Sequence, residues 1–279
     1  MTTRISVRQA IGPREAAQLD TTGLRQDFLI ETLFGPGAIE LVYSHFDRMI
    51  VGSAVPAGTP LVLDAIRETG TASFLERREL VVLNIGEPGT VEVDGTRHEL
   101  GRLEALYVGC GSGPVTLASG STPGAAFYLV STPAHRKCKT VKVGLDQARK
   151  VKAGSAAEAN ARTINQYIHP DVCESCQVLL GVTMFELGSV WNTMPAHVHD
   201  RRMEAYLYFD MADNTRVFHL MGEPGETRHI VIKDREAVLS PPWSIHAGAG
   251  TGRYSFVWAM AGDNISFTDM DMVPMDALR

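Results

Sequence analysis

The sequence predicts an all-β fold made of two consecutive barrels, with short helices at the N-terminus and in the connection between the barrels. Short runs that favour β-strands recur along most of the chain, and Gly and Pro separate them at nearly regular intervals, which is typical of barrels and sandwiches. A more polar, lysine-rich stretch at residues 134–162 interrupts this pattern before it resumes. We therefore expect one barrel within residues 1–150 and a second within residues 151–279.

Short helices are expected first near the N-terminus. Pro13 follows Gly12 at the start of one helix, because proline favours the first helical turn, and residues 21–30 form either a second short helix or a docking arm. Further along, the Asp94-Gly95 pair after an alternating run predicts a tight hairpin turn. The strand-like runs of the first half are residues 41–53, 80–86, 90–95, 106–109 and 126–131.

The second half is also rich in strand-like runs, and the run Met203–Phe209 alternates most clearly. Successive side chains of a strand point to opposite faces, so Glu204, Tyr206 and Tyr208 would share one face. A site on that face would contain tyrosine hydroxyls. The strand-like runs of this half are residues 163–168, 177–186, 203–211, 217–221, 229–232, 237–239 and 254–260.

Composition and charge exclude several classes of protein. The chain has 279 residues with 44% hydrophobic and 21% charged residues, which is ordinary for a globular protein. A net charge of −6 and the absence of a Lys/Arg run argue against a nucleic-acid partner. No apolar stretch approaches a membrane span of about 20 residues, and the N-terminus lacks the apolar core of a signal peptide. Four scattered cysteines do not form a disulfide framework, so a cytoplasmic location is expected.

A group of candidate metal ligands precedes and enters the alternating run. His197 and His199 are two residues apart, so on a strand both imidazoles would point to the same face. The polar segment Asp200–Arg202 predicts a hairpin turn that returns the chain antiparallel and sets Glu204 beside the two histidines. Two imidazoles and a carboxylate suit zinc, manganese, iron or nickel. The alternative is that these residues are incidental, because such triplets also arise by chance in long chains.

A fourth candidate ligand comes from a resemblance to the cupin family. The pattern His197-x-His199-x4-Glu204 is similar to the first cupin motif, and the prolines of Ser240–His246 resemble the second. Together they imply a small β-barrel that holds one metal with three histidines and one glutamate, His246 included. The first half resembles a cupin barrel without these histidines, and no comparable His/Glu cluster occurs within residues 80–131. We therefore expect that barrel to be degenerate, metal-free and chiefly structural.

Motifs along nearly the whole chain resemble the 4-deoxy-L-threo-5-hexosulose-uronate ketol-isomerase family. The resemblance implies a zinc-dependent bicupin of pectin breakdown, usually a hexamer, with one Zn²⁺ per chain held by His197, His199, Glu204 and His246. It also implies conversion of the hexosulose uronate to 3-deoxy-D-glycero-2,5-hexodiulosonate. The matching segments are residues 43–52, 76–80, 131–136, 164–170, 194–204, 226–230, 240–246 and 269–271.

The implied reaction moves a carbonyl by one carbon and needs a base. The substrate carries an aldehyde beside a hydroxylated carbon, and a metal can stabilise the enediolate that forms when the proton between them is removed. His229 and Tyr206 are candidates for the base on position alone. Arg202 shares strand parity with Glu204, so we expect it to bind the substrate carboxylate, with Arg201 outside the pocket.

Two other interpretations of the chain use the same ligand set. One is an iron-dependent cupin dioxygenase, which metal analysis and oxygen consumption would distinguish from an isomerase. The other is a non-catalytic sugar-binding cupin. The pair Cys173-x-x-Cys176 has no second pair nearby and lies in a β context, so we expect two small structural cysteines there rather than a zinc or redox site.

Overall fold

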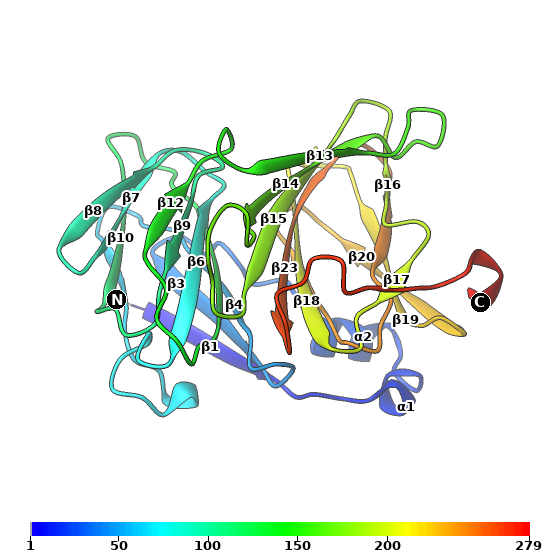
Figure 1. The fold of residues 1–279 in the computed structure, drawn as a ribbon, viewed down its shortest axis with the longest axis horizontal. Helices are drawn as coiled ribbons and strands as arrows, with labels where there is room; N and C mark the ends of the chain where they lie inside the picture. Colours follow the sequence, from blue (N-terminus) through cyan, green and yellow to red (C-terminus); the bar gives the residue numbers. More distant parts are fainter. Residues whose placement is uncertain (1) are drawn as a thin grey trace. The chain divides into compact units, whose positions relative to one another are not determined.

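The computed structural model describes residues 2–279, and strands dominate it (Figure 1). The predicted all-β fold class is confirmed. The chain forms two compact units, and each draws on separate stretches of sequence. The first unit contains β1 (Thr2–Arg8) and residues 32–148 and 167–179, and the second contains residues 9–31, 149–166 and 180–279. Residues 9–31 thus belong to the second unit and residues 167–179 to the first, although a boundary near residue 150 would assign each to the other unit.

The first barrel consists of a seven-stranded and a four-stranded sheet. Its Asp94-Gly95 turn has positive φ at both residues, 51° and 72°, and joins β7 (Gly89–Val93) to β8 (Thr96–Leu100) as the sequence predicts. A short 3₁₀-helix, η1 (Arg67–Thr69), lies in a connection. The larger sheet has the order β1, β3 (Ala38–Ser44), β4 (Ile50–Ala54), β11 (Phe127–Pro133), β6 (Arg78–Asn84), β9 (Ala105–Val108) and β12 (Val141–Val143), and the smaller one β5 (Leu61–Leu63), β10 (Val115–Ser119), β7 (Gly89–Val93) and β8 (Thr96–Leu100).

Apolar side chains fill the interior of the first barrel. They come from alternate positions of facing strands, such as Leu80 and Val82 on the larger sheet and Val91 and Val93 on the smaller one. Each of these four is at most 3% exposed. Because alternate residues of a strand face the same side, the inner faces of these strands form a hydrophobic core.

The second barrel repeats the pairing of a seven-stranded with a four-stranded sheet and adds a two-stranded ribbon (Figure 1). The larger sheet has the order β13 (Arg149–Ala153), β14 (Arg162–Ile168), β15 (Leu179–Phe185), β23 (Ser255–Gly262), β18 (Arg202–Phe209), β21 (Ala237–Ser240) and β2 (Leu29–Ile30). The smaller one has β16 (Trp191–Asn192), β22 (Ala247–Gly250), β19 (Val217–Glu223) and β20 (Glu226–Ile232), and the ribbon pairs β17 (His197–Val198) with β24 (Asp271–Met272).

The helices are short, and the N-terminal ones pack with the second barrel. α1 (Pro13–Ala16) begins at a proline as expected, and the Asp20 side chain accepts from the backbone N–H of Gly23 and caps α2 (Thr21–Phe28). Arg25 of α2 donates to the carbonyl of Val231. The helix predicted in the connection is wrong, because residues 134–162 form strands and turns. A 3₁₀-helix, η2 (Met275–Ala277), lies near the C-terminus.

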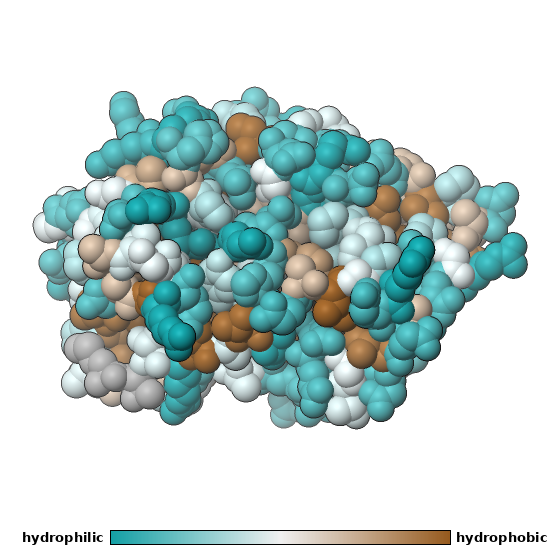
Figure 2. Space-filling view, turned by 90° about the horizontal axis from the view of Figure 1, so that it is seen from below, coloured by the Kyte–Doolittle hydropathy of each residue, from teal (hydrophilic) through white to brown (hydrophobic). Residues whose placement is uncertain are grey.

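The surface drawn in Figure 2 is mainly hydrophilic, and its apolar residues form separate patches. Single apolar residues at a surface are normal in globular proteins. In the described part of the chain, no helix has both the length and the apolar character that crossing a bilayer requires.

Candidate metal centre and its cavity

The turn predicted between the histidines and Glu204 is present, but the hairpin is not. The backbone N–H of Arg202 donates to the carbonyl of His199 over 3.0 Å, which closes a turn around Asp200 and Arg201. After the turn β18 pairs with β21 and β23, whereas β17 pairs with β24. The predicted pairing of the two segments with each other is therefore wrong, because the residues before the turn join a separate ribbon. The turn alone returns Glu204 to the histidines.

The four predicted ligands converge in the interior of the second barrel. The Nε2 atom of His197 lies 3.1 Å from Nε2 of His199 and 2.9 Å from Nε2 of His246. Oε1 of Glu204 lies 2.6 Å from Nε2 of His199 and 3.7 Å from Nε2 of His246. Ligands bound to one cation at about 2.0–2.2 Å are roughly 2.8–3.6 Å apart. The four atoms are therefore spaced as the ligands of a single metal ion.

The contacts behind the ligands also fit a bound cation. Nδ1 of His199 lies 2.7 Å from the carbonyl of Asp269, which can only accept, so Nδ1 carries the proton and Nε2 presents its lone pair. Nδ1 of His246 faces the hydroxyl of Ser240 at 3.4 Å. Oε2 of Glu204 is buried and has no hydrogen-bond partner in the described chain. Three imidazoles and a carboxylate directed at one point form the donor set that divalent transition metals prefer.

Burial and the single carboxylate determine the charges of this group. Burial lowers the pKa of His197 to about 4 and that of His246 well below its usual value, so both rings are neutral, as a metal ligand requires. Burial also opposes charge on His199, but contact with Glu204 raises the pKa of that ring. Although burial alone would raise the pKa of Glu204, His246 and His199 hold it below its usual range. The glutamate is therefore ionised.

A segment near the C-terminus supplies the hydrogen-bond acceptor for Nδ1 of His199. The guanidinium of Arg201 bonds to both oxygens of Asp269 at 2.8 and 2.9 Å and to Asp271 at 2.8 Å. These hydrogen bonds hold the pKa of the Asp269 carboxyl well below its usual range. The same Asp269 supplies the carbonyl that accepts from His199. Arg201 thus faces outward, as its strand parity predicts, and positions the partner of a ligand.

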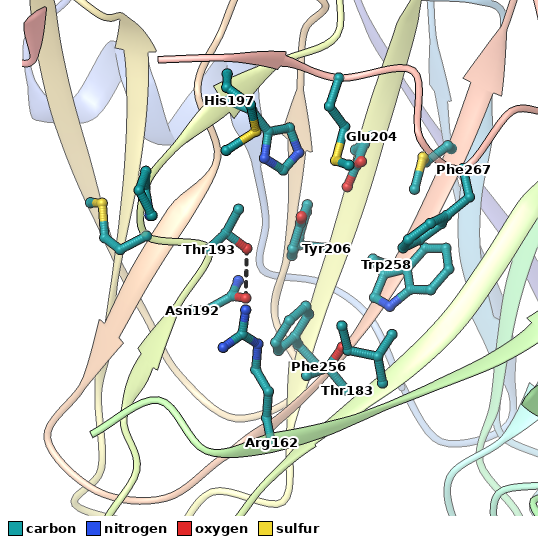
Figure 3. Close-up of a pocket in the computed structure, with 16 residues that line it drawn as sticks. Arg162, Thr183, Asn192, Thr193, His197, Glu204, Tyr206, Phe256, Trp258 and Phe267 are labelled. Atoms are coloured by element: carbon teal, nitrogen blue, oxygen red, sulfur yellow. Dashed lines mark hydrogen bonds between the residues drawn. The ribbon is translucent and has the colours of Figure 1, made fainter. Parts of the chain in front are cut away.

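A cavity of about 330 Å³ opens beside the ligands, within the second barrel (Figure 3). Its volume is at the lower end of the range of about 300–1,000 Å³ found for small-molecule sites. His197 and Glu204 lie at one end, with Tyr206 next to them, and Arg162 lies at the other end. Many of the lining side chains are aromatic residues or methionines, including Phe256, Trp258, Met260, Phe267, Met270 and Met272.

The other predicted site residues fall in different places. Tyr206 lines the cavity, and Tyr208 donates its hydroxyl proton to, or accepts from, Nδ1 of the buried His219 at 2.7 Å. His229 is exposed on β20, because its neighbour Ile230 faces the barrel interior and strand side chains alternate. His229 is thus outside the cavity and is not positioned as its base.

Arg202 also does not line the cavity. Its side chain is 1% exposed, and Nη2 donates to the carbonyl of Asp269 at 2.6 Å and lies 3.2 Å from Nδ1 of His199. It shares a face with Glu204, as predicted, but lies on the far side of the ligands from the cavity. The geometry therefore does not support Arg202 as the residue that binds a substrate carboxylate.

Two polar residues of the cavity were not singled out by their sequence. Arg162 begins β14, and Asn192 ends the two-residue strand β16. Neither belongs to a motif. Arg162 shares strand parity with Ile164, which also lines the cavity, but only the position of β14 beside β15 brings this face to the cavity.

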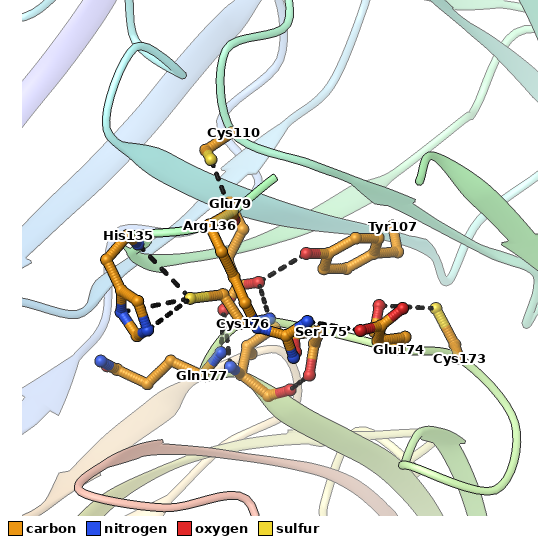
Figure 4. Close-up of polar contacts among 11 residues, drawn as sticks. Glu79, Tyr107, Cys110, His135, Arg136, Cys173, Glu174, Ser175, Cys176 and Gln177 are labelled. Carbon is orange, nitrogen blue, oxygen red and sulfur yellow. Dashed lines mark hydrogen bonds and ion pairs between the residues drawn. The ribbon is translucent and has the colours of Figure 1, made fainter. Parts of the chain in front are cut away.

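The cysteines belong to the first unit, and the four candidate ligands belong to the second. Cys173 and Cys176 are buried and free, in agreement with the expectation of structural cysteines. The thiol of Cys176 contacts the ring of His135 at 3.5 Å (Figure 4). Burial raises the pKa of Cys173 to about 12, which keeps that thiol protonated and unreactive.

Comparisons with known proteins agree with the fold and with the resemblance. The model of the KduI/IolB family matches residues 35–275. A relative from Rhizobium meliloti (strain 1021), 4-deoxy-L-threo-5-hexosulose-uronate ketol-isomerase 1, is 65% identical over 280 residues and is aligned over 100% of both chains.

Solved structures share the fold at much lower identity. An IolB-like protein from Salmonella typhimurium LT2 matches with a TM-score of 0.65 and 14% identity, over 81% of this chain and 86% of its own. Oxalate decarboxylase from Lactobacillus farciminis, in a formate complex, matches with a TM-score of 0.56 and 9% identity, over 78% of each chain. These matches support the cupin-type two-barrel architecture and nothing about activity.

Proposed function

The chain belongs to the KduI/IolB family, and on that premise we propose that it is a ketol-isomerase that acts on 4-deoxy-L-threo-5-hexosulose uronate. The observation that carries the proposal from the structure is the set of four converging ligand atoms at one end of a cavity within the second barrel. The reaction moves the carbonyl from the terminal carbon to its hydroxylated neighbour. The neighbour loses its carbon-bound proton and its hydroxyl proton, and the terminal carbon and its oxygen each gain one proton, so the substrate as a whole is neither oxidised nor reduced.

His197, His199, Glu204 and His246 would hold one divalent metal in the proposed enzyme. A metal bound there supplies a Lewis acid that stabilises negative charge on the substrate oxygens, an effect worth several kcal/mol. Glu204 contributes the one negative charge among the four ligands. Phe256 and Trp258 make part of the cavity wall apolar.

Tyr206 places a hydroxyl in the cavity next to the ligands, and we propose that this hydroxyl donates its proton to a substrate oxygen in a hydrogen bond. Its side chain is 4% exposed, and burial together with the carboxylate of Glu204 raises its pKa well above the usual value. The phenol therefore stays protonated at neutral pH. Its Oη can donate a hydrogen bond to a substrate oxygen that becomes negative as the carbonyl moves.

We expect the substitution Tyr206→Phe to lower kcat by about 10²-fold, because the ring remains but the proton on Oη is lost. KM should change much less than kcat, since the cavity keeps its shape. Steady-state kinetics, together with metal content and thermal melting, will measure this. A variant with unchanged kcat would exclude the hydroxyl from the reaction.

Oxygen consumption and metal content together test the reaction type. Purified protein, incubated with the ketouronate in an oxygen electrode, should form product without consuming oxygen, and bound metal should reach one equivalent per chain. Oxygen uptake in proportion to substrate loss, with iron as the bound metal, would instead identify a dioxygenase.

Three finer features belong to the same proposal. Zinc as the metal and a hexamer follow from the family resemblance, and a cytoplasmic location follows from the scattered cysteines and the N-terminal sequence. Elemental analysis, light scattering of the purified protein, and fractionation of the source cells test these in turn.

A further inference from the structure

The cavity has one strongly basic residue. Of the residues that line it in the described chain, Arg162 is the only arginine or lysine, and Glu204 is the only carboxylate. Figure 3 shows them at opposite ends, with Tyr206 and Phe256 between them. The cavity therefore has a ligand end and a cationic end.

The guanidinium of Arg162 is only partly used by the protein. Nη1 donates to the carbonyl of Asn160 at 2.8 Å, which fixes the direction of the side chain. No hydrogen bond in the described part of the chain involves Nε or Nη2. One edge of the guanidinium thus stays available for the paired hydrogen bonds that arginine makes with a carboxylate.

Asn192 supplies a second free donor close to Arg162. The side chain is 2% exposed, and Thr193 donates its hydroxyl proton to Oδ1 over 2.7 Å, which orients the amide. Nδ2 is buried and has no hydrogen-bond partner in the described residues. The segment that precedes Asn192 is hydrogen-bonded to the segment that precedes Arg162, because the N–H groups of Val190 and Trp191 both donate to the carbonyl of Ala159. A buried amide donor without a partner is costly unless a ligand satisfies it.

We infer that Arg162 and Asn192 form the subsite that binds the carboxylate of the substrate. This inference rests on the proposed function for the identity of the substrate, and it replaces Arg202 in the role expected from the sequence. A six-carbon chain with an aldehyde at one end and a carboxylate at the other would lie along the cavity between its two ends. The subsite therefore fixes which end of the chain meets the metal ligands.

A binding experiment tests the subsite without relying on turnover. The probes are D-glucuronate and D-glucuronamide, which differ in charge at one end of a six-carbon sugar. Calorimetry on the purified protein, with its metal content measured, should show glucuronate binding at least about tenfold more tightly than the amide. This preference should disappear in Arg162→Gln and shrink in Arg162→Lys, which keeps the charge but not the paired donors.

Kinetics on the ketouronate provide the second measurement. Arg162→Gln and Asn192→Leu should raise KM by about 10- to 100-fold, with the larger effect at Arg162 and with metal content and melting temperature unchanged. Arg253→Gln, at an exposed position, is the matched control and should behave like the wild-type protein.

The outcomes separate the inference from the proposed function. Equal binding of the two probes by the wild-type protein, or a preference that survives in Arg162→Gln, would overturn the subsite even if the enzyme is an active isomerase. A protein without isomerase activity that still prefers glucuronate through Arg162 would refute the proposed function and leave the subsite in place.

Discussion

Replacement of His246 with alanine is expected to remove the bound metal and to lower kcat/KM by about 10³-fold or more, because several kcal/mol of charge stabilisation depend on the metal. His246 is 1% exposed, and its Nε2 lies 2.9 Å from Nε2 of His197. Without this imidazole, three ligands remain around an enlarged and open coordination site. Elemental analysis and steady-state kinetics on the same preparation will measure both effects.

His229→Ala is the matched control for this experiment. It removes an imidazole from the same barrel, but from an exposed position on β20. We expect it to retain full metal content and activity. A folded His246→Ala protein with one metal per chain would contradict the ligand assignment. Loss of activity in His229→Ala alone would restore that residue as the base.

The second large effect is expected on stability, at Glu79 in the first unit. This side chain is fully buried, and its carboxylate accepts five hydrogen bonds, some of which Figure 4 shows. Oε2 accepts from the hydroxyl of Tyr107 at 2.6 Å and from the backbone N–H of Cys176 at 2.7 Å. Oε1 accepts from the hydroxyl of Thr132 and from the backbone N–H groups of residues 177 and 178. One carboxylate thus holds the chain from residue 176 to residue 178 against β6.

Glu79→Gln should destabilise the first unit by about 3–5 kcal/mol, because an amide NH₂ in place of Oε2 would face the N–H of Cys176 and leave a buried donor unsatisfied. Denaturant unfolding, followed by circular dichroism, measures the change. Glu99→Gln is the control, since Glu99 is exposed on β8. If both variants unfold at the same denaturant concentration as the wild-type protein, the network does not stabilise the fold.

Local patterns in the sequence were sufficient to predict much of the fold. Strand alternation identified β18 and the face that carries Glu204 and Tyr206, and the Asp94-Gly95 pair identified a hairpin, because both depend on neighbouring residues alone. The two histidines and Glu204 could be grouped for the same reason, since a single turn connects them.

Features that depend on pairing between segments far apart in the sequence could not be predicted from local patterns. The strand β17 pairs with β24, some seventy residues later, so a hairpin was the nearer but incorrect prediction. Strand parity predicts which face of the sheet a side chain lies on, but not whether the side chain lines the cavity. Arg202 and Glu204 lie on the same face, yet only Glu204 lines the cavity. Arg162 and Asn192 meet at the cavity only through contacts between residues 159 and 190, which no motif encodes.

Proton NMR in D₂O, with purified protein and 4-deoxy-L-threo-5-hexosulose uronate, tests the central claim most directly. The signal of the proton on the aldehyde carbon should disappear, and signals of a hydroxymethyl group should appear. Deuterium should enter that group, because the transferred proton can exchange with solvent. His246→Ala should leave the spectrum unchanged over the same time. An unaltered spectrum with metal-loaded wild-type protein, or a product oxidised at the aldehyde carbon, would contradict the claim.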